Sequence, residues 1–215
     1  MHRILLFVLL LATGIRLQAQ ALENGTLGFQ IGYDFAAHGT LTRTEILGIA
    51  DTDTGGAVTN MFNIGLQYSF ASWFSAGISF DYGSYIEDSA DMGANGNTFN
   101  TLSIDGRLYP LNGDKFNWYI GGQAGITNLT IHRLDPVTTL DASYKYISPH
   151  MGLFTGFNWY IFNVAGLFFQ IDYSSHNFVL KELTLDNIVQ DLTNVEQSLD
   201  TKGAGVRVGV AFHIH

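Results

Sequence analysis

The chain alternates apolar and polar residues along eight segments, and the last segment shows the alternation most clearly. Between Gly203 and His215, larger apolar residues occupy every second position, and glycine, alanine, arginine or histidine lies between them. Successive side chains of a β-strand point to opposite faces, so each segment predicts a strand with one apolar face and one polar or small face. The predicted strands are 26–38, 57–70, 73–85, 98–109, 116–132, 144–160, 164–175 and 203–215.

The connections between these strands alternate between long and short. They run roughly 18, 2, 12, 6, 11, 3 and 27 residues. Outer-membrane barrels have short periplasmic turns and long external loops, and an even number of strands returns the chain to its starting side. The sequence therefore predicts an all-β, eight-stranded antiparallel up-and-down transmembrane β-barrel, with both termini in the periplasm and the long loops outside the cell.

The tryptophans support a membrane position for this barrel. Trp73, Trp118 and Trp159 each lie next to one of the three short connections. Aromatic rings with a polar edge prefer the membrane–water interface. A soluble barrel with aromatic residues at one end is the alternative. The membrane reading predicts that one set of apolar residues faces lipid near mid-membrane, namely Ile78, Ile104, Ile120 and Val208.

Composition and the N-terminus fit an exported protein. Charged residues make up 13% of the 215 residues, about half the usual fraction. Residues 1–21 are predicted to be a cleaved signal peptide, because a weakly basic start precedes the apolar run 4–12 and the small-residue pattern Ala19-Gln20-Ala21. The barrel is then 22–215. The net charge of −9 disfavours a nucleic-acid partner, and the absence of cysteine excludes disulfides and thiolate metal sites.

The chain resembles the small eight-stranded outer-membrane barrels, the OmpX-like and OmpA-barrel-like proteins, over about 22–215. The resemblance is carried by the glycine-rich stretch 119–125, by Arg107-Leu108-Tyr109-Pro110, and by an aromatic residue in the final strand. It implies a monomer that is inserted through recognition of its C-terminal strand. Members of the family usually end on an aromatic residue, whereas this chain ends Phe212-His213-Ile214-His215, which weakens that signal.

Several ionisable residues are predicted to face the barrel interior. An eight-stranded barrel is filled by side chains, so charges inside it must pair or be hydrated. Arg207 is expected to pair with Asp172, or with an acid across the lumen such as Asp105 or Asp81, while Arg107 finds a second partner. We interpret the set as a structural polar network, with an ion path or catalysis as alternatives. Its members are Arg107, Arg207, Asp81, Asp105, Asp172 and Gln170, with Asp34 also facing inward.

Three short motifs suggest chemistry but have simpler interpretations. Asp51-Thr52-Asp53-Thr54-Gly55 resembles the start of a calcium loop without its later ligands, so an acidic turn is the better interpretation. Ser174-Ser175-His176 suggests a hydrolase, yet lacks the serine spacing of outer-membrane lipases. His213 and His215 have a spacing that could bind metal, although a chance arrangement at the terminus is the simpler explanation. We predict no cofactor and no bound metal.

The last long connection contains an apolar repeat. Leu185, Ile188, Leu192, Val195 and Leu199 recur at helical spacing. Residues 184–199 could therefore form an amphipathic helix, a strand that protrudes above the membrane, or a loop folded over the barrel mouth.

The sequence favours a structural or surface-interaction role in the outer membrane, without catalysis. Outer-membrane lipid and lipopolysaccharide are the expected partners. An enzyme acting on membrane lipid and a narrow channel for small solutes are the alternatives.

Overall fold

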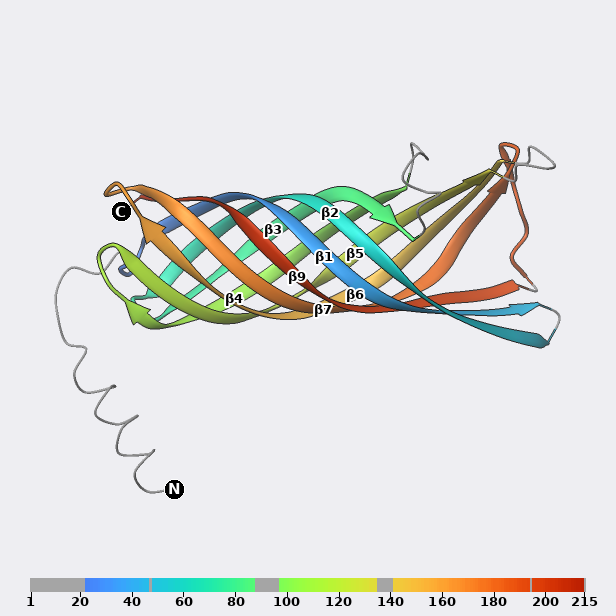
Figure 1. Ribbon diagram of the computed structural model, residues 1–215, viewed down its shortest axis with the longest axis horizontal. Helices are drawn as coiled ribbons and strands as arrows, with labels where there is room; N and C mark the ends of the chain where they lie inside the picture. The colour runs from blue at the N-terminus through green and yellow to red at the C-terminus, as the bar shows by residue number, and fades with distance from the viewer. Residues whose placement is uncertain (1–21, 47, 88–96, 135–140, 194, 215) are drawn as a thin grey trace, which may run out of the picture.

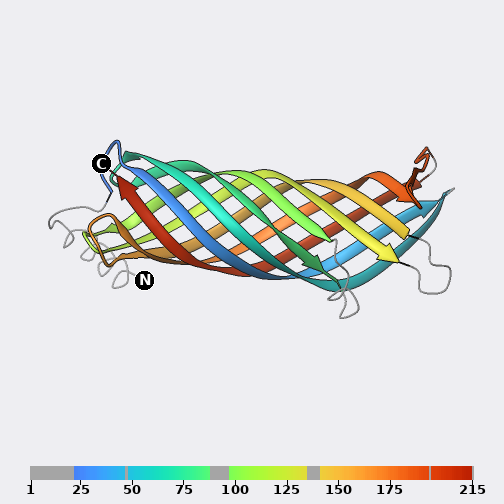
Figure 2. The ribbon, with the colours of Figure 1, turned by 90° about the horizontal axis from the view of Figure 1, so that it is seen from above.

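The computed structural model describes residues 22–46, 48–87, 97–134, 141–193 and 195–214, which form an elongated β-barrel (Figures 1 and 2). Long strands make up the wall: β1 Leu27–Ile46, β2 Ile49–Ala71, β3 Phe74–Ile86, β4 Thr98–Asn112, β5 Phe116–Leu134, β6 Asp141–Tyr160, β7 Ala165–Leu185 and β9 Val195–Ile214. A two-residue strand, β8 Ile188–Val189, pairs with the tip of β7.

The barrel closes because its last strand pairs with its first. Each long strand pairs antiparallel with the next one in the sequence, and β9 pairs with both β7 and β1. The closing register runs from Leu27 opposite Ile214 to Ile46 opposite Val195. The predicted eight-stranded, up-and-down antiparallel barrel is confirmed. We call the end that holds the short turns the turn end and the opposite end the flap end.

The outer wall is apolar, as the alternation predicted. Ile78, Ile104, Ile120 and Val208 are 53%, 67%, 41% and 48% exposed, so the prediction that they face outward is confirmed. We call this apolar outer wall the belt, and exposed aromatic residues border it. Trp73, Trp118, Trp159, Phe70 and Phe162 lie at the turn end, and Tyr33, Phe62 and Tyr82 form a cross-strand row nearer the flap end. This distribution suits a barrel surrounded by lipid. In the described residues, no helix is long and apolar enough to cross a membrane.

Two predicted loops are largely strand. β1 and β2 continue to Ile46 and Ile49, and β7 and β9 extend across much of the segment 176–202. The helix considered for 184–199 is absent from the described part of that segment. A tight turn at Asp186 and Asn187, with φ of 46° and 65°, folds the chain back instead. Beyond the belt a strand needs no apolar face toward lipid, so its sequence lacks the alternation that identified the other strands.

The wall divides at the flap end, as Figure 1 shows on its right. Pairing between β7 and β9 ends at Val179 and Ser198. Beyond that point β9 continues along β1, and β7 continues along β6 as far as Leu185 opposite Ala142. The ends of β1, β2 and β9 form one projection, the hairpin flap, and the ends of β5, β6 and β7 form the second flap.

The Asp51–Gly55 motif lies in β2 of the hairpin flap, so the prediction of an acidic turn is wrong. Pairing of β2 with β3 begins only at Val58. Asp51 Oδ1 accepts a hydrogen bond from the Thr52 N–H at 2.9 Å, and Asp53 Oδ1 accepts one from the Thr54 N–H at 2.8 Å. Two backbone donors of this segment thereby gain side-chain partners, and charge on an edge strand discourages pairing with another chain.

Candidate functional site: charged layers inside the barrel

Arg207 organises a charged layer at mid-barrel, which we call the central layer. Its Nε and Nη2 donate to Asp34 Oδ2 at 2.9 and 2.8 Å, and Nη2 lies 3.0 Å from Asp81 Oδ1. Asn63 Nδ2 donates to the same Asp81 oxygen at 2.7 Å. The register explains the contacts, because Asp34 is opposite Arg207 and Asn63 is opposite Asp81 on neighbouring strands. All four side chains are buried.

Arg107 organises a second layer nearer the turn end, which we call the lower layer. Its Nε donates to Asp105 Oδ1 at 3.1 Å, and its Nη1 donates to Gln30 Oε1 at 2.8 Å. The guanidinium also lies 4.9 Å from the centre of the Tyr119 ring and 5.6 Å from that of Phe154. One acid and one base are therefore matched and covered by aromatic faces.

The predicted ion pairs of Arg207 are confirmed only for Asp81. Asp81 pairs with Arg207, whereas Asp105 pairs with Arg107 instead. Asp172 is opposite Gly205, and no described basic side chain lies within salt-bridge distance of it. Gln170 is the cross-strand neighbour of Arg207 and accepts a hydrogen bond from the Tyr119 hydroxyl at 3.3 Å.

Asp34 is the main partner of Arg207, and the sequence interpretation did not single it out. The register between the first strand and the last strand could have identified this pair from the sequence. In an up-and-down barrel the first and last strands must pair, so residues at matching distances from the turn end become neighbours. Asp34 and Arg207 are each seven positions from the ends of this register, Leu27 and Ile214.

Three buried imidazoles lie next to the central layer toward the flap end. His150 Nδ1 and His176 Nε2 are 2.8 Å apart, and His176 Nδ1 lies 3.2 Å from Thr201 Oγ1. His38 Nε2 lies 3.2 Å from Thr59 Oγ1. Sequence spacing did not reveal this group because its members come from three different strands. No three metal-ligating side chains in the described residues are arranged to hold a metal ion.

The hydrolase interpretation of Ser174-Ser175-His176 gains no support from these contacts. Alternation along β7 buries Ser174 and His176 inside the barrel and leaves Ser175 on the opposite face. His176 uses both ring nitrogens toward His150 and Thr201. In the other metal candidate, His213 with His215, the second histidine lies outside the described residues.

Apolar side chains fill the barrel interior at the flap end. Sequence alternation did not predict this group, because it assigned the inner face to polar and small residues. Tyr85 and Phe99 stack with ring centres 6.1 Å apart, and Phe99 meets Phe178 edge to face at 6.0 Å. His176 stacks on Phe178 at 5.4 Å and so joins this group to the imidazoles. We call the group the apolar plug; its buried members are Ala57, Met61, Tyr85, Phe99, Leu129, Ile131, Tyr146, Phe178, Leu180 and Leu199.

The turn end is closed by the start of the described chain. Leu22 is buried against Tyr109, Tyr119 and Phe154. Asn112 holds its backbone in place, donating from Nδ2 to the Leu22 carbonyl at 2.8 Å and accepting from the Leu22 N–H at 3.3 Å. The interior is thus filled at both ends as well as in the middle.

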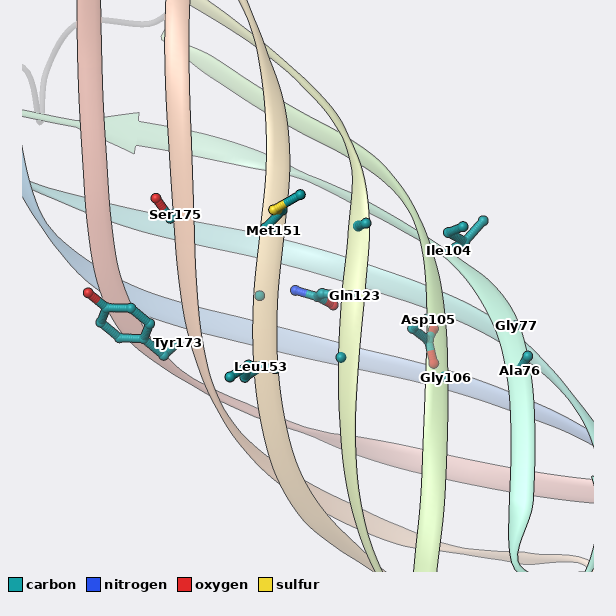
Figure 3. A pocket seen from close by; sticks show the side chains of 13 residues that line it. Ala76, Gly77, Ile104, Asp105, Gly106, Gln123, Met151, Leu153, Tyr173 and Ser175 are labelled. Atoms are coloured by element: carbon teal, nitrogen blue, oxygen red, sulfur yellow. The ribbon is translucent and has the colours of Figure 1, made fainter.

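Among the described residues, the cavities inside the barrel are small, and a larger hollow lies on its outer wall. The cavity between the central layer and the imidazoles has a volume of about 20 Å³, and a second one at the lower layer has about 10 Å³. A hollow of about 830 Å³ lies instead on the outer wall across β3 to β7, where Ala76, Gly106 and Gly122 leave a depression beside Met151 and Leu153 (Figure 3).

Comparison with known proteins identifies the fold but no family. No protein-family model matches the chain, and no curated protein matches it. The solved structures do. The outer membrane protein OprG from Pseudomonas aeruginosa is 13% identical, covers 92% of this chain and 100% of its own, and has a TM-score of 0.61. The fold is that of small outer-membrane β-barrels. The outer membrane protein AlkL, solved in lipid bilayers, is 10% identical with a TM-score of 0.54, covering 92% of this chain and 94% of its own.

Proposed function

We propose that the protein is a non-catalytic outer-membrane barrel that acts through the surface of its two flaps, without carrying solutes through its lumen. One observation supports a membrane barrel without transport: an apolar outer wall surrounds an interior that side chains fill from Leu22 to the apolar plug. A channel needs a continuous lumen, and the interior hollows of the described residues hold about one water molecule each.

The proposed location is the outer membrane, with the turn end in the periplasm and the flaps outside the cell. The C-terminal strand, which carries Phe212 and Ile214 on its outer face, would be recognised during insertion. We propose a monomer, because the sheet closes within one chain. Fractionation tests the location: the protein should float with outer membranes and migrate differently on gels before and after heating. Recovery as a soluble periplasmic protein would contradict it.

Conductance across a planar bilayer tests the proposed absence of transport. The wild-type barrel should show no ion current above the background of the bilayer. A double variant, Phe99→Ala with Phe178→Ala, removes two buried rings of the apolar plug that contact each other and serves as the comparison. Regular conductance steps in the wild type would contradict a filled barrel.

Anionic lipid is the proposed partner at the membrane surface. Lys202 on β9 and Lys181 on β7 point outward and are exposed, and Lys181 lies two residues beyond the point where β7 and β9 separate. Lys202 is opposite Ser175, two residues beyond the exposed ring of Tyr173, so its ammonium lies near the border of the apolar belt. Neither lysine has a described acid within salt-bridge distance. Phosphate groups of lipopolysaccharide fit such a position.

Binding of purified lipopolysaccharide to the barrel in detergent tests this partner. The double variant Lys181→Gln with Lys202→Gln should bind more weakly than wild type, and the difference should shrink in high salt. Lys115→Gln is the matched control, since Lys115 is exposed at the turn end. Equal binding by all three proteins would exclude these lysines from the contact.

A further inference from the structure

The central layer contains more acid than base. Three buried carboxylates, from Asp34, Asp81 and Asp172, face the single guanidinium of Arg207. If all of them were ionised, the layer would carry two uncompensated negative charges. The lower layer shows no such excess, because Asp105 and Arg107 match one to one. Uncompensated charge inside a barrel is costly, since few solvent molecules are available to stabilise it.

Two of these carboxylates face the same small space. Asp34 uses only Oδ2 toward Arg207, and its Oδ1 has no hydrogen-bond partner; Asp172 Oδ1 has none either. A Cβ added at Gly205 would come within 3.1 Å of Asp34 Oδ1 and 3.0 Å of Asp172 Oδ2. Both residues also line the 20 Å³ cavity. A glycine at 205 therefore leaves the room in which the two carboxylates approach each other.

The surrounding elements offer no second cation. β6 and β7 contribute His150 and His176, and β1 contributes His38; no described carboxylate lies within salt-bridge distance of these rings. The strands β2, β4 and β5 face the cavity with neutral groups, namely Met61, Phe99, Thr101 and Gln123. The ion pair of Asp105 and Arg107 is self-contained and lies toward the turn end. A proton on an imidazole would add a buried charge that pairs directly with no described acid, whereas a proton on a carboxylate removes a buried charge.

We propose that Asp34 and Asp172 form a buried proton-binding site that holds one extra proton at neutral pH. Two carboxylates that share one desolvated space cannot both ionise readily, and the proton converts one of them into a neutral hydrogen-bond donor. The folded barrel then binds one more proton than the unfolded chain, in which both aspartates are ionised. Stability must therefore fall as pH rises, until the site loses its proton. The stability of the barrel therefore decreases at alkaline pH, through a site that lies away from the flaps.

Heat unfolding of the complete mature barrel in detergent tests the site between about pH 6 and about pH 9. The wild-type Tm should fall across this range. Asp172→Asn supplies a neutral group of the same shape and has no carboxyl to ionise in the unfolded chain, so its Tm should exceed that of wild type already at the acidic end, exceed it by more at the alkaline end, and lose most of the slope. Two controls bracket it. Asp114→Asn, exposed at the turn end, should follow wild type. Asp105→Asn leaves Arg107 without its acid and should lower Tm at every pH.

Infrared spectroscopy gives a readout that does not depend on unfolding. Wild type at neutral pH should show the carbonyl band of a protonated carboxylic acid, and Asp172→Asn should lack it. A flat wild-type profile, or an Asp172→Asn shift of equal size at every pH, would overturn the proposal. A metal ion is the other cation that could offset the charge of Asp34 and Asp172, and metal analysis of the purified barrel tests it. Stoichiometric zinc that is lost in Asp172→Asn would show that a metal ion and not a proton compensates the charge.

Discussion

The lower and central layers use the same residue types in one barrel but balance them differently. In the lower layer, Arg107 meets one acid, a glutamine and two aromatic rings, so its charge is fully matched. In the central layer, Arg207 is shared between Asp34 and Asp81, and Asp172 is left without a base. The difference shows that burial alone does not define the role of a charge. A layer whose acids and bases are equal in number fills the barrel and stabilises it. A layer with excess acid must bind a proton or another cation from solution to offset the charge.

The largest predicted effect comes from breaking the central layer at its only cation. Arg207→Met leaves three buried acids without a base and should cost about 3–5 kcal/mol of unfolding free energy. Urea unfolding of the barrel in lipid vesicles measures this cost. Adding Asp34→Asn and Asp81→Asn should recover much of it, because the uncompensated charges are removed. A triple variant less stable than the single one would mean that the charges themselves are not the source of the loss.

Breaking the lower layer should cost less and should be easier to repair. Arg107→Met leaves only Asp105 unpaired, so its loss should lie near the lower end of the same range, about 3 kcal/mol. Arg107→Met with Asp105→Asn should be closer to wild type than Arg107→Met alone. Because Asp105 also accepts a hydrogen bond from Gln67, the double variant retains one polar contact of the layer. The same unfolding measurement compares the two layers, and equal repair in both would remove the distinction between them.

The smallest predicted effect concerns an ion pair outside the belt. Lys145 Nζ lies 2.7 Å from Glu182 Oε1 in the second flap, and this hydrogen bond lowers the pKa of Glu182 below its usual value. The stability that this shift provides is present above the usual glutamate pKa and is lost as pH falls through the lowered one. Because Glu182 is open to solvent, Glu182→Gln should leave Tm at neutral pH unchanged within error. A clear loss would place this pair among the stabilising contacts of the barrel.

The sequence predicted the belt well and the flaps poorly, for a physical reason. Along residues such as Phe62 to Phe70 and Val206 to Phe212, lipid outside and polar groups inside impose strict alternation, so strand and facing direction follow directly. In the hairpin flap the strand 49–57 has small and polar residues on both faces, so its sequence resembled a loop. Inside the barrel, alternation identified Asp81 and Arg207 as inward and offered Asp81 as one possible partner of Arg207, but it did not identify Asp34 as a partner. Partners depend on closing register, on strand tilt and on small residues such as Gly205 that leave space.

The imidazoles and the apolar plug were missed for a related reason. His38, His150 and His176 are distant in sequence and meet only when the barrel closes. Phe99, Leu129 and Phe178 occupy inward positions where an outer-membrane barrel usually has polar residues. In the sequence, the apolar plug could have been predicted from apolar residues that occupy inward positions of an otherwise regular alternation.

Site-directed labelling tests the central claim most directly, because the chain contains no cysteine and single cysteines can be placed at will. In vesicles, Ile104→Cys on the outer wall should react only with a lipid-soluble thiol reagent. Its neighbour Ser103→Cys, buried inside the barrel, should react with neither a lipid-soluble nor a water-soluble reagent, and Thr52→Cys in the hairpin flap should react with the water-soluble one. Rapid labelling of Ser103→Cys from water would reveal an open lumen. Water-soluble labelling of Ile104→Cys would show that the apolar wall does not meet lipid, and either result would contradict a filled barrel in a membrane.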